Sequence, residues 1–521
     1  MFMIRADVLP PAVRLAPPAP GKGMMLKVLL ANAPNPTDNR NASNYACYPH
    51  IGIVQLATAT REALGDRVDI QVVDGGISNT ETVQQAVRDF APDVVGISAL
   101  TPTYSEALKI AETAKACGAK VVLGDDHAIF FPEMILRNRP QIDYVIANDG
   151  GEIPFVELIR MLLDDTGSLS EVSSLAYRRD GRIHVNPAPK YALSLRNTIP
   201  DLSFIDDVLD VYADNYRQQF GHLHGHQVRP VTVNNARGCE NGYKRCTYCS
   251  IADLTVNTGD PRGFWKTIDQ YNREHGINLF FEVYDSFTAS PRYVDALIDS
   301  TPPHLKRRID DGELQVMVYA RALGLTKRNN VDKLRRLGVT RANIGLDAAD
   351  PEMLEAQRKN KTTGETNLEA IRMLNKAGIS VHASYIAGAP GERPETLDRT
   401  IAGIRQMLGE VELSSVEFSR FIPLPNSPAW DLLVDYERPN FFKSSEEIDS
   451  YLTALGITVT RQDREEMFAR FGEKDLLDID ELGAFWADNF THITERYALE
   501  RIGEVDEMVS AHNVRTGNNV G

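Results

Sequence analysis

The segment Ala236-Arg-Gly-Cys-Glu-Asn-Gly-Tyr-Lys-Arg-Cys-Thr-Tyr-Cys-Ser-Ile251 holds three of the five cysteines in a chain of 521 residues. Cys239, Cys246 and Cys249 place three thiolates on one loop. Three thiolates can hold three irons of a four-iron cluster and leave the fourth iron open. An open iron can bind the amino and carboxylate groups of S-adenosylmethionine (SAM), and an electron passed to the sulfonium then yields the 5′-deoxyadenosyl radical.

A zinc site is the alternative interpretation of the same cysteines. Three cysteines and one histidine complete a tetrahedron, and His222, His224 and His226 lie just upstream. The strands and helices that follow the loop favour the iron–sulfur interpretation, because a zinc site does not need them. The histidines then form a polar loop or an access route to the active site.

A series of six strand patterns begins just before the cysteine loop. Helical patterns such as residues 367–377 and 395–408 separate these strands. The series predicts a barrel or partial barrel over residues 229–430, with its function at the carboxyl ends of the strands. The strands are expected at residues 231–235, 279–285, 314–321, 342–347, 381–387 and 416–422.

A second α/β pattern precedes this series and covers residues 25–165. Short β-branched runs alternate with helical stretches such as residues 105–116, which predicts a doubly wound parallel sheet of the Rossmann type. The segments that follow its strands are small, polar or rich in Gly and Pro, as a ligand crevice at the carboxyl ends requires. Strands are expected at residues 26–32, 68–74, 93–98, 120–124 and 143–148.

The remaining segments and the composition indicate the domain boundaries and exclude some classes of function. Residues 1–24 are expected to form a flexible tail, 166–228 a connector and 431–521 a mostly helical region. A net charge of −16 argues against a nucleic-acid-coating surface. No apolar run approaches the roughly 20 residues that span a bilayer, and the sparse, odd number of cysteines does not suggest disulfides. A cytoplasmic location is expected.

Several segments outside the cysteine loop together resemble the cobalamin-binding branch of the radical SAM superfamily. The resemblance covers residues 25–430. In the first pattern it involves Phe90–Tyr104, the turn Gly124-Asp-Asp-His127-Ala, Ile142-Asp-Tyr-Val and Gly150-Gly-Glu152. In the second it involves Asp285-Ser-Phe-Thr288, Ala387-Gly-Ala-Pro-Gly-Glu392 and Phe421-Ile-Pro-Leu-Pro-Asn-Ser-Pro428.

Three features depart from the pattern of that branch. Six residues, rather than the usual three, separate Cys239 from Cys246, so the loop must bulge. Asp347 stands where a longer carboxylate is more common. Asp125 and Asp126 occupy positions where Gly and Pro are common, which adds charge near the expected corrin.

The resemblance implies roles for individual residues. Cys239, Cys246 and Cys249 would hold the 4Fe-4S cluster. SAM contacts are expected from Tyr248, Glu282, Asp285, Ser286, Arg321, Asp347 and Tyr385, of which Tyr385 could instead line the substrate cavity or fill the barrel. Cobalamin contacts are expected from Ser98, Thr101, Thr103, Gly124, His127, Gly151 and Glu152.

His127 is expected to act as a hydrogen-bonding turn residue rather than a cobalt ligand, because the Asp-x-His-x-x-Gly motif that supplies such a ligand is lacking. Cys47 lies in a loop that could approach cobalamin or substrate, and a buried, inert thiol is the other interpretation. Cys117 is assigned no role.

The resemblance also implies an activity. The expected enzyme cleaves SAM reductively and uses methylcobalamin to methylate an unactivated carbon of a small molecule. The expected substrate is a biosynthetic natural-product intermediate. The electrons are expected from a donor such as flavodoxin or ferredoxin. A radical oxidation, ring contraction or cyclisation without methyl transfer is the second possibility. A non-catalytic zinc- or corrinoid-binding module is the third. Substrate identity and oligomeric state do not follow from the sequence.

Overall fold

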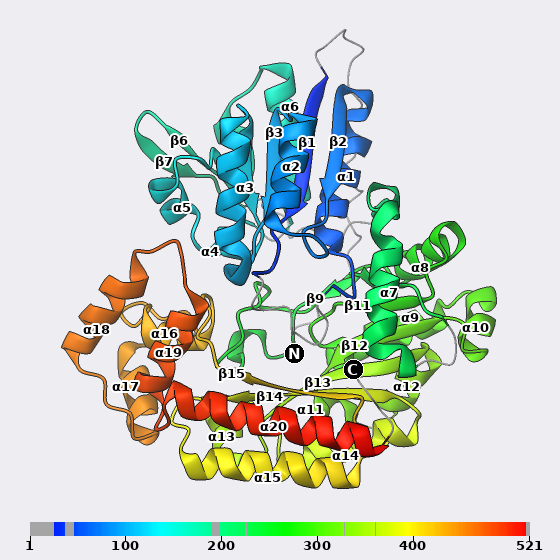
Figure 1. Ribbon diagram of the computed structural model, residues 1–521, viewed down its shortest axis with the longest axis vertical. Helices are drawn as coiled ribbons and strands as arrows, with labels where there is room; N and C mark the ends of the chain where they lie inside the picture. Colours follow the sequence, from blue (N-terminus) through cyan, green and yellow to red (C-terminus); the bar gives the residue numbers. More distant parts are fainter. Residues whose placement is uncertain are drawn as a thin grey trace, which may run out of the picture.

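A computed structural model of the protein describes residues 25–36, 46–148, 150–188, 198–223, 227–327, 329–359 and 361–516. Two α/β units lie one above the other, with helices of the C-terminal part beside and below the second unit (Figure 1). The tail at residues 1–24, together with His224 and His226, lies outside the described residues. Within the described ranges, no helix combines the length and apolar character needed to cross a membrane.

The first unit is built on a seven-stranded sheet in the order β2-β1-β3-β4-β5-β6-β7. The strands from β1 to β5 are parallel, which confirms the predicted doubly wound sheet. Their bounds are β1 Leu26–Asn32, β2 Val68–Val73, β3 Val94–Ser98, β4 Lys120–Gly124 and β5 Tyr144–Ile146.

An antiparallel hairpin extends this sheet into the segment predicted as a connector. It consists of β6 (Leu175–Arg179) and β7 (Arg182–Val185), and β6 pairs with β5. Asp180 and Gly181 form its turn with φ values of +51° and +72°. An Asp-Gly pair favours such a turn because both positions need positive φ. The pair was therefore a signal for a hairpin that the sequence analysis overlooked.

Helices cover both faces of the first sheet. α1 (Ile51–Leu64) and α6 (Glu152–Asp164) pack on the face formed by Val28 and Leu30, whereas α2 (Thr80–Phe90) and α3 (Tyr104–Ala116) pack on the opposite face. Alternate side chains of β1 point to opposite faces, so both faces need apolar cover. The short helices α4 (Asp126–Phe130) and α5 (Pro132–Asn138) follow β4.

The second unit is an open half-barrel of six parallel strands in the order β15-β14-β13-β12-β11-β8, as predicted. Helices pack on its outer face. The strand bounds are β8 Pro230–Val233, β11 Leu279–Glu282, β12 Gln315–Ala320, β13 Val339–Asp347, β14 Ser380–Ala387 and β15 Ser415–Arg420. The helices that provide most of the packing are α8 Pro261–His275, α9 Pro291–Asp299, α12 Asn330–Arg336, α14 Gly364–Lys376 and α15 Pro394–Glu410.

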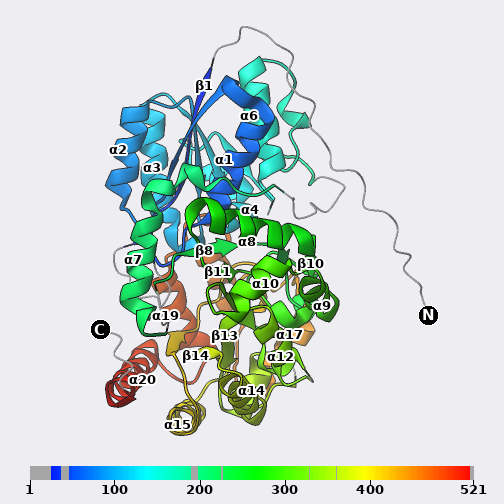
Figure 2. The ribbon, with the colours of Figure 1, turned by 90° about the vertical axis from the view of Figure 1, so that its right-hand side faces the viewer.

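The remaining elements lie near the boundary between the units or within the second unit. α7 (Leu209–Phe220) runs beside the half-barrel, and Figure 2 shows α8 at the boundary between the units. The strands β9 (Ala236–Arg237) and β10 (Asn257–Thr258) pair across the base of the cysteine loop. The short helices α10 (Pro303–Asp310), α11 (Ala322–Leu325) and α13 (Pro351–Ala356) complete the second unit.

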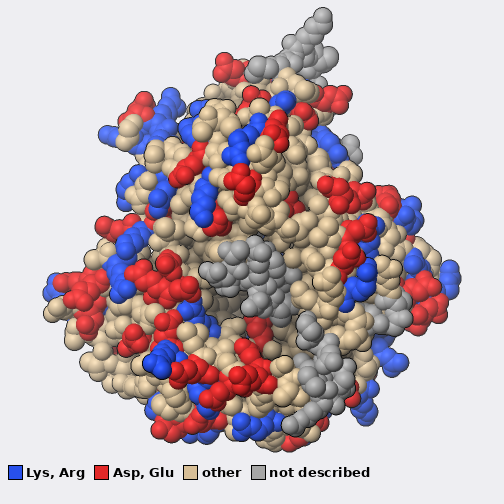
Figure 3. Space-filling view, viewed as in Figure 1, with Lys and Arg blue, Asp and Glu red and all other residues tan. Residues whose placement is uncertain are grey.

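The C-terminal helices pack against both units. They are α16 Pro428–Leu433, α17 Ser445–Ala454, α18 Arg461–Met467, α19 Ile479–Phe490 and α20 Glu495–Thr516. Trp486 of α19 stacks between Phe421 and Phe490, and its indole N–H donates to the carbonyl of Gly388 at 2.9 Å. Acidic and basic side chains are interspersed over the face of the molecule shown in Figure 3.

Candidate cofactor sites

The cysteine loop follows β8 and β9 at one edge of the half-barrel. A Cβ added at Gly238 would lie 2.0 Å from the carbonyl oxygen of Thr255, and one at Gly242 would lie 1.9 Å from that of Leu254. Only glycine allows so close an approach of the two backbones. A 3-10 turn over Gly242–Lys244 takes up the additional residues between the first two cysteines. The longer spacing is therefore accommodated by a local turn.

Arg245 braces this loop from within, and the sequence analysis missed it. The side chain is 1% exposed, and Nε donates to the carbonyl of Gly242 at 3.1 Å. Nη1 donates to the carbonyls of Ile251 and of Asn426, the latter at 3.1 Å. The guanidinium also lies 4.5 Å from the ring centre of Phe441. One buried cation thus ties the loop to the chain that follows β15.

Two thiols of the loop have pKa values above the ordinary value for cysteine. Burial raises the pKa of Cys239 to about 12, with a further contribution from Glu240, and burial raises the pKa of Cys249 to about 11. Bound metal requires thiolates, so its binding releases these protons. The affinity of the loop for iron is therefore expected to rise with pH.

The donor set fits a four-iron cluster better than zinc. Sulfurs that bind three different irons need not converge on one point, whereas a zinc site gathers its ligands around a single ion. In the part of the chain that the structure describes, no three His, Cys, Asp or Glu side chains converge closely enough to hold one metal ion. His222 lies instead near Arg341, and burial together with this cation lowers its pKa.

Two acidic side chains lie beside the cysteine loop, Glu282 at the end of β11 and Asp285 just after it. Asp285 accepts a hydrogen bond from the backbone N–H of Gly238 at 2.7 Å, and burial raises its pKa. Glu282 is completely buried, and its Oε1 accepts from the backbone N–H of Asn235 at 2.9 Å. Burial raises the pKa of Glu282 to about 8. Both carboxylates thus hold the backbone on either side of β9.

Unpaired polar atoms gather at the same strand ends. Glu282 Oε2, Ser286 Oγ and Arg321 Nη2 are buried and find no hydrogen-bond partner among the described residues. The other terminal nitrogen of Arg321 donates to Glu240 Oε1 at 3.2 Å. Buried polar atoms are rarely left unpaired in folded proteins. A ligand with amino, carboxylate and hydroxyl groups, such as SAM, fits this set of donors and acceptors.

A second buried cluster lies behind the Cys-x-x-Cys segment. Asp347 forms an ion pair with Lys359, and the two side chains are 3% and 5% exposed. Lys359 Nζ also donates to the hydroxyl of Tyr248 at 3.3 Å. Burial and the nearby Asp347 raise the pKa of Tyr248. Tyr248 and Asp347 were both predicted as site residues, whereas Lys359, which links them, was not.

Tyr385 is the strand-register partner of Asp347, yet its side chain packs among apolar residues. It belongs to the apolar core between the half-barrel and its outer helices, and its hydroxyl donates to the sulfur of Met407 in α15 at 3.3 Å. Its ring packs edge-on against Phe418. Alternation along β14 turns this side chain outward. The structure therefore gives the expected SAM contact no support, and Tyr385 contributes to packing.

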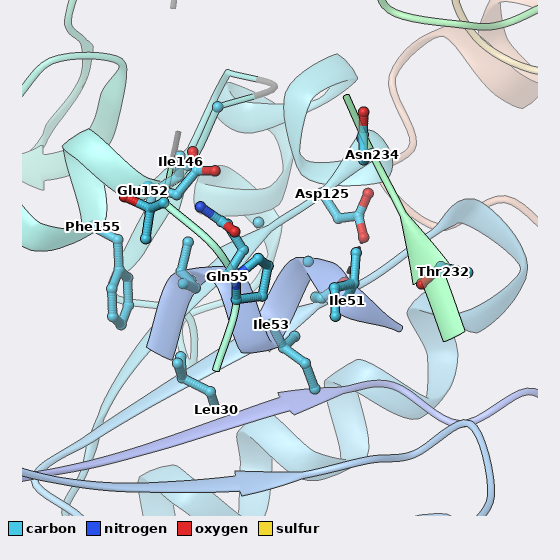
Figure 4. A pocket seen from close by; sticks show the side chains of 18 of the residues that line it. Leu30, Ile51, Ile53, Gln55, Asp125, Ile146, Glu152, Phe155, Thr232 and Asn234 are labelled. Atoms are coloured by element: carbon cyan, nitrogen blue, oxygen red, sulfur yellow. Dashed lines mark hydrogen bonds between the residues drawn. The ribbon is translucent and has the colours of Figure 1, made fainter. Parts of the chain in front are cut away.

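A cavity of about 300 Å³ lies where the two units meet. Leu30, Ile53 and Phe155 line one side, and Asp125, Thr232 and Asn234 line the other (Figure 4). The cavity therefore has an apolar side and a polar side.

The apolar side depends on a glycine. A Cβ at Gly96 would lie 2.6 Å from Leu30 Cδ2 and 3.3 Å from Phe155 Cε2, so a side chain there would fill the space. Cobalamin combines polar amide groups around its corrin ring with an apolar nucleotide base. The residues on the two sides of the cavity fit that combination.

Some predicted cobalamin contacts line this cavity and others do not. Ser98, Gly124, Gly151 and Glu152 line it. The cavity also takes residues from α1 and α8, such as Gln55 and Thr267, which sequence analysis missed because no local motif marks them.

Thr101, Thr103 and His127 do not line the cavity. Both ring nitrogens of His127 are engaged within the protein, Nδ1 with Thr101 Oγ1 at 3.2 Å and Nε2 with the backbone carbonyl of Asp475 at 2.6 Å. Thr103 Oγ1 donates to the carbonyl of Leu100. Burial lowers the pKa of His127 to about 4, so the ring is neutral at pH 7. These side chains shape the turn behind the cavity.

The two remaining cysteines lie outside both sites. Cys47 is buried beside Tyr48 against α7 and the half-barrel, and burial raises its pKa to about 12. A thiol in such surroundings is inert. Cys117 is exposed at the end of α3.

Two family models match the chain, one on each unit. A B12 binding domain matches residues 40–159, and the radical SAM superfamily matches residues 233–402. An uncharacterized methyltransferase of Pyrococcus horikoshii is 25% identical over 74% of this chain and 78% of its own length. An anaerobic magnesium-protoporphyrin IX monomethyl ester cyclase of Cereibacter sphaeroides is 27% identical over 69% of this chain and 57% of its own length.

A solved structure shares the arrangement of both units. The cobalamin-dependent SAM radical enzyme OxsB, with aqua-cobalamin bound, superimposes with a TM-score of 0.60 and 16% identity over 80% of this chain and 61% of its own. That likeness concerns the fold. With both family models and the cysteine loop, the chain belongs to the cobalamin-dependent radical SAM enzymes. Its cofactors are cobalamin, SAM and a 4Fe-4S cluster.

Proposed function

We propose that this enzyme is a radical C-methyltransferase that acts on an unactivated carbon of a small molecule. The observation that carries the proposal is a wall shared by the two cofactor sites. Residues 232–235 and Arg237 line the cavity at the junction of the units, and the chain reaches Cys239 two residues later. A radical centre formed at the loop and a methyl donor held in the cavity would therefore lie on either side of one short segment.

The residues divide into those that bind each cofactor and those that position the binding residues. Cys239, Cys246 and Cys249 would hold the cluster. Glu282, Ser286 and Arg321 offer polar atoms to SAM, and Ser98, Gly124 and Glu152 offer theirs to cobalamin. When bound, the cluster with SAM supplies a carbon radical by reductive cleavage, and cobalamin supplies the methyl group.

The protein's own contribution is orientation and the exclusion of water. The buried Asp347–Lys359 pair fixes Tyr248 beside the second and third cysteines. Asp285 and Glu282 hold the backbone where the loop begins. The C-terminal helices cover the loop after β14 through the bond from Trp486 to Gly388. Such cover would shield a radical from solvent when the cofactors are bound.

Anaerobic reconstitution with iron, sulfide and hydroxocobalamin tests the proposal. The loaded protein is incubated with methyl-deuterated SAM and either a chemical reductant or a flavodoxin or ferredoxin, which we propose as the natural class of electron donor. Mass spectrometry then measures 5′-deoxyadenosine and S-adenosylhomocysteine separately. Formation of both supports the methyltransferase. The absence of 5′-deoxyadenosine from protein with a full cluster would refute it.

A radical cyclisation or oxidation without methyl transfer is the second candidate. The similarity to the magnesium-protoporphyrin cyclase favours it, because that relative carries a different activity on a comparable stretch of chain. In the same experiment this candidate predicts 5′-deoxyadenosine from the cobalamin-loaded protein without S-adenosylhomocysteine.

A further inference from the structure

The turn after β4 holds Asp125 in a backbone conformation that an aspartate rarely adopts. Its φ is +79° and its ψ is −179°. That region is essentially restricted to glycine, because a Cβ meets the neighbouring peptide groups there. The strain is retained although a glycine at this position would remove it. Such a residue usually serves a purpose that its conformation makes possible.

Helix capping does not account for the aspartate. Asp125 precedes α4, and its Oδ1 accepts from the backbone N–H of Asp126 at 2.8 Å, which is the first position of that helix. A capping side chain normally reaches the second or third N–H and has an extended backbone with negative φ. The helix itself is only five residues long. The contact therefore orients the carboxylate more than it stabilises a helix.

The carboxylate lies at the cofactor cavity and keeps free acceptor capacity. Asp125 lines the cavity, and Figure 4 shows it on the polar side near Asn234. Its Oδ2 accepts from the hydroxyl of Ser98, which also lines the cavity. A carboxylate offers about four acceptor positions, and these two bonds use two. Among the described residues, no Lys or Arg forms an ion pair with it.

We propose that Asp125 is a cobalamin-binding residue whose strained backbone aims its carboxylate at an N–H or O–H donor of the cofactor. The inference rests on the proposed use of the cavity and adds a residue and the chemistry of its contact. A carboxylate accepts hydrogen bonds and repels phosphate. The donor is therefore an amide of the corrin ring or a ribose hydroxyl of the nucleotide.

The variant Asp125→Gly separates the strain from the contact, because glycine fits the backbone and lacks the acceptor. We expect the melting temperature of the cofactor-free variant to rise by about 1–2 °C. We expect its affinity for hydroxocobalamin to fall about 10-fold or more, as for loss of a hydrogen bond to a charged group. A merely structural aspartate would not give this opposite pair of changes.

Ala91→Gly is the matched control. Ala91 is an exposed residue with a φ of +47° at the end of α2, and it does not line the cavity. Its replacement should raise the melting temperature similarly and leave the affinity for hydroxocobalamin unchanged. Both variants are titrated with hydroxocobalamin and with cobinamide, which lacks the nucleotide, and binding is followed by visible absorbance.

The outcomes are distinct. A loss in Asp125→Gly that persists with cobinamide supports the proposal with a corrin amide as the donor, and a loss that disappears supports it with the ribose. Unchanged hydroxocobalamin affinity in Asp125→Gly, or an equal loss in Ala91→Gly, overturns it. If the wild-type protein binds no cobalamin at all, both the proposed use of the cavity and the proposed role of Asp125 are refuted.

Discussion

Replacement of Asp475 by alanine is expected to loosen the junction between the C-terminal region and the cobalamin-binding unit. Asp475 is 2% exposed and lies between α18 and α19. Its carboxylate accepts from the Tyr104 hydroxyl at 2.7 Å, from Asn138 Nδ2 at 3.0 Å and from Arg139 Nε at 2.7 Å. All three donors belong to the first unit, so one carboxylate joins segments more than 300 residues apart.

The size of the effect follows from these contacts. A hydrogen bond to a charged group contributes about 1.5–3 kcal/mol, and an unpaired buried donor costs about 1–3 kcal/mol. The summed values overestimate the loss for two reasons. The contributions of contacts made by one carboxylate are not additive. In the variant, Arg139 regains some hydration because its side chain is 28% exposed. We therefore expect Asp475→Ala to lower the free energy of unfolding by about 3 kcal/mol.

Urea denaturation of the cofactor-free protein, followed by circular dichroism, measures this loss. Glu473→Ala is the control, because it removes one exposed negative charge from the same segment. A loss in Asp475→Ala no larger than that in the control would refute the reasoning.

The pH dependence of this contribution has a definite sign. Burial alone would raise the pKa of Asp475, but its bonds to Arg139, Tyr104 and Asn138 lower the pKa on balance. Its stabilisation is therefore fully present above about pH 4, the ordinary value for aspartate, and is lost as the pH falls through the lower folded value. The difference between wild type and Asp475→Ala should shrink only in that acidic range.

Three further outcomes are expected. Cys246→Ala should lose the cluster absorbance near 400 nm and all 5′-deoxyadenosine formation, whereas Cys117→Ala should keep both. Arg245→Ala should lower the iron bound per chain after reconstitution several-fold without unfolding the half-barrel, because it removes the internal brace of the loop; an iron content equal to wild type would contradict that role. Folding raises the pKa of Glu282 to about 8. The cofactor-free protein should therefore lose stability as the pH rises from about 4.5 to 8. In urea titrations across this pH range, the loss should be smaller for Glu282→Gln than for the wild type.

The sequence by itself was enough for the architecture, and it also predicts the cluster ligands. Apolar runs of strand length alternate with helical patterns in both units, and this local periodicity reports which faces of each element are buried. The three cysteines are neighbours along the chain, so their joint chemistry needed no knowledge of the fold. The Asp180-Gly181 hairpin was equally local and would have been found by attention to its turn.

The tertiary structure decided which polar side chains reach a cofactor site and which support it from behind. The Tyr385 hydroxyl donates to Met407 in the core, and the His127 ring bonds to the Asp475 carbonyl behind the cavity. The role of Lys359 could not be predicted from the sequence, because Asp347 becomes its neighbour only when the chain packs. Burial, orientation and long-range pairing arise when elements pack together, and a pattern along the chain carries no direct record of them.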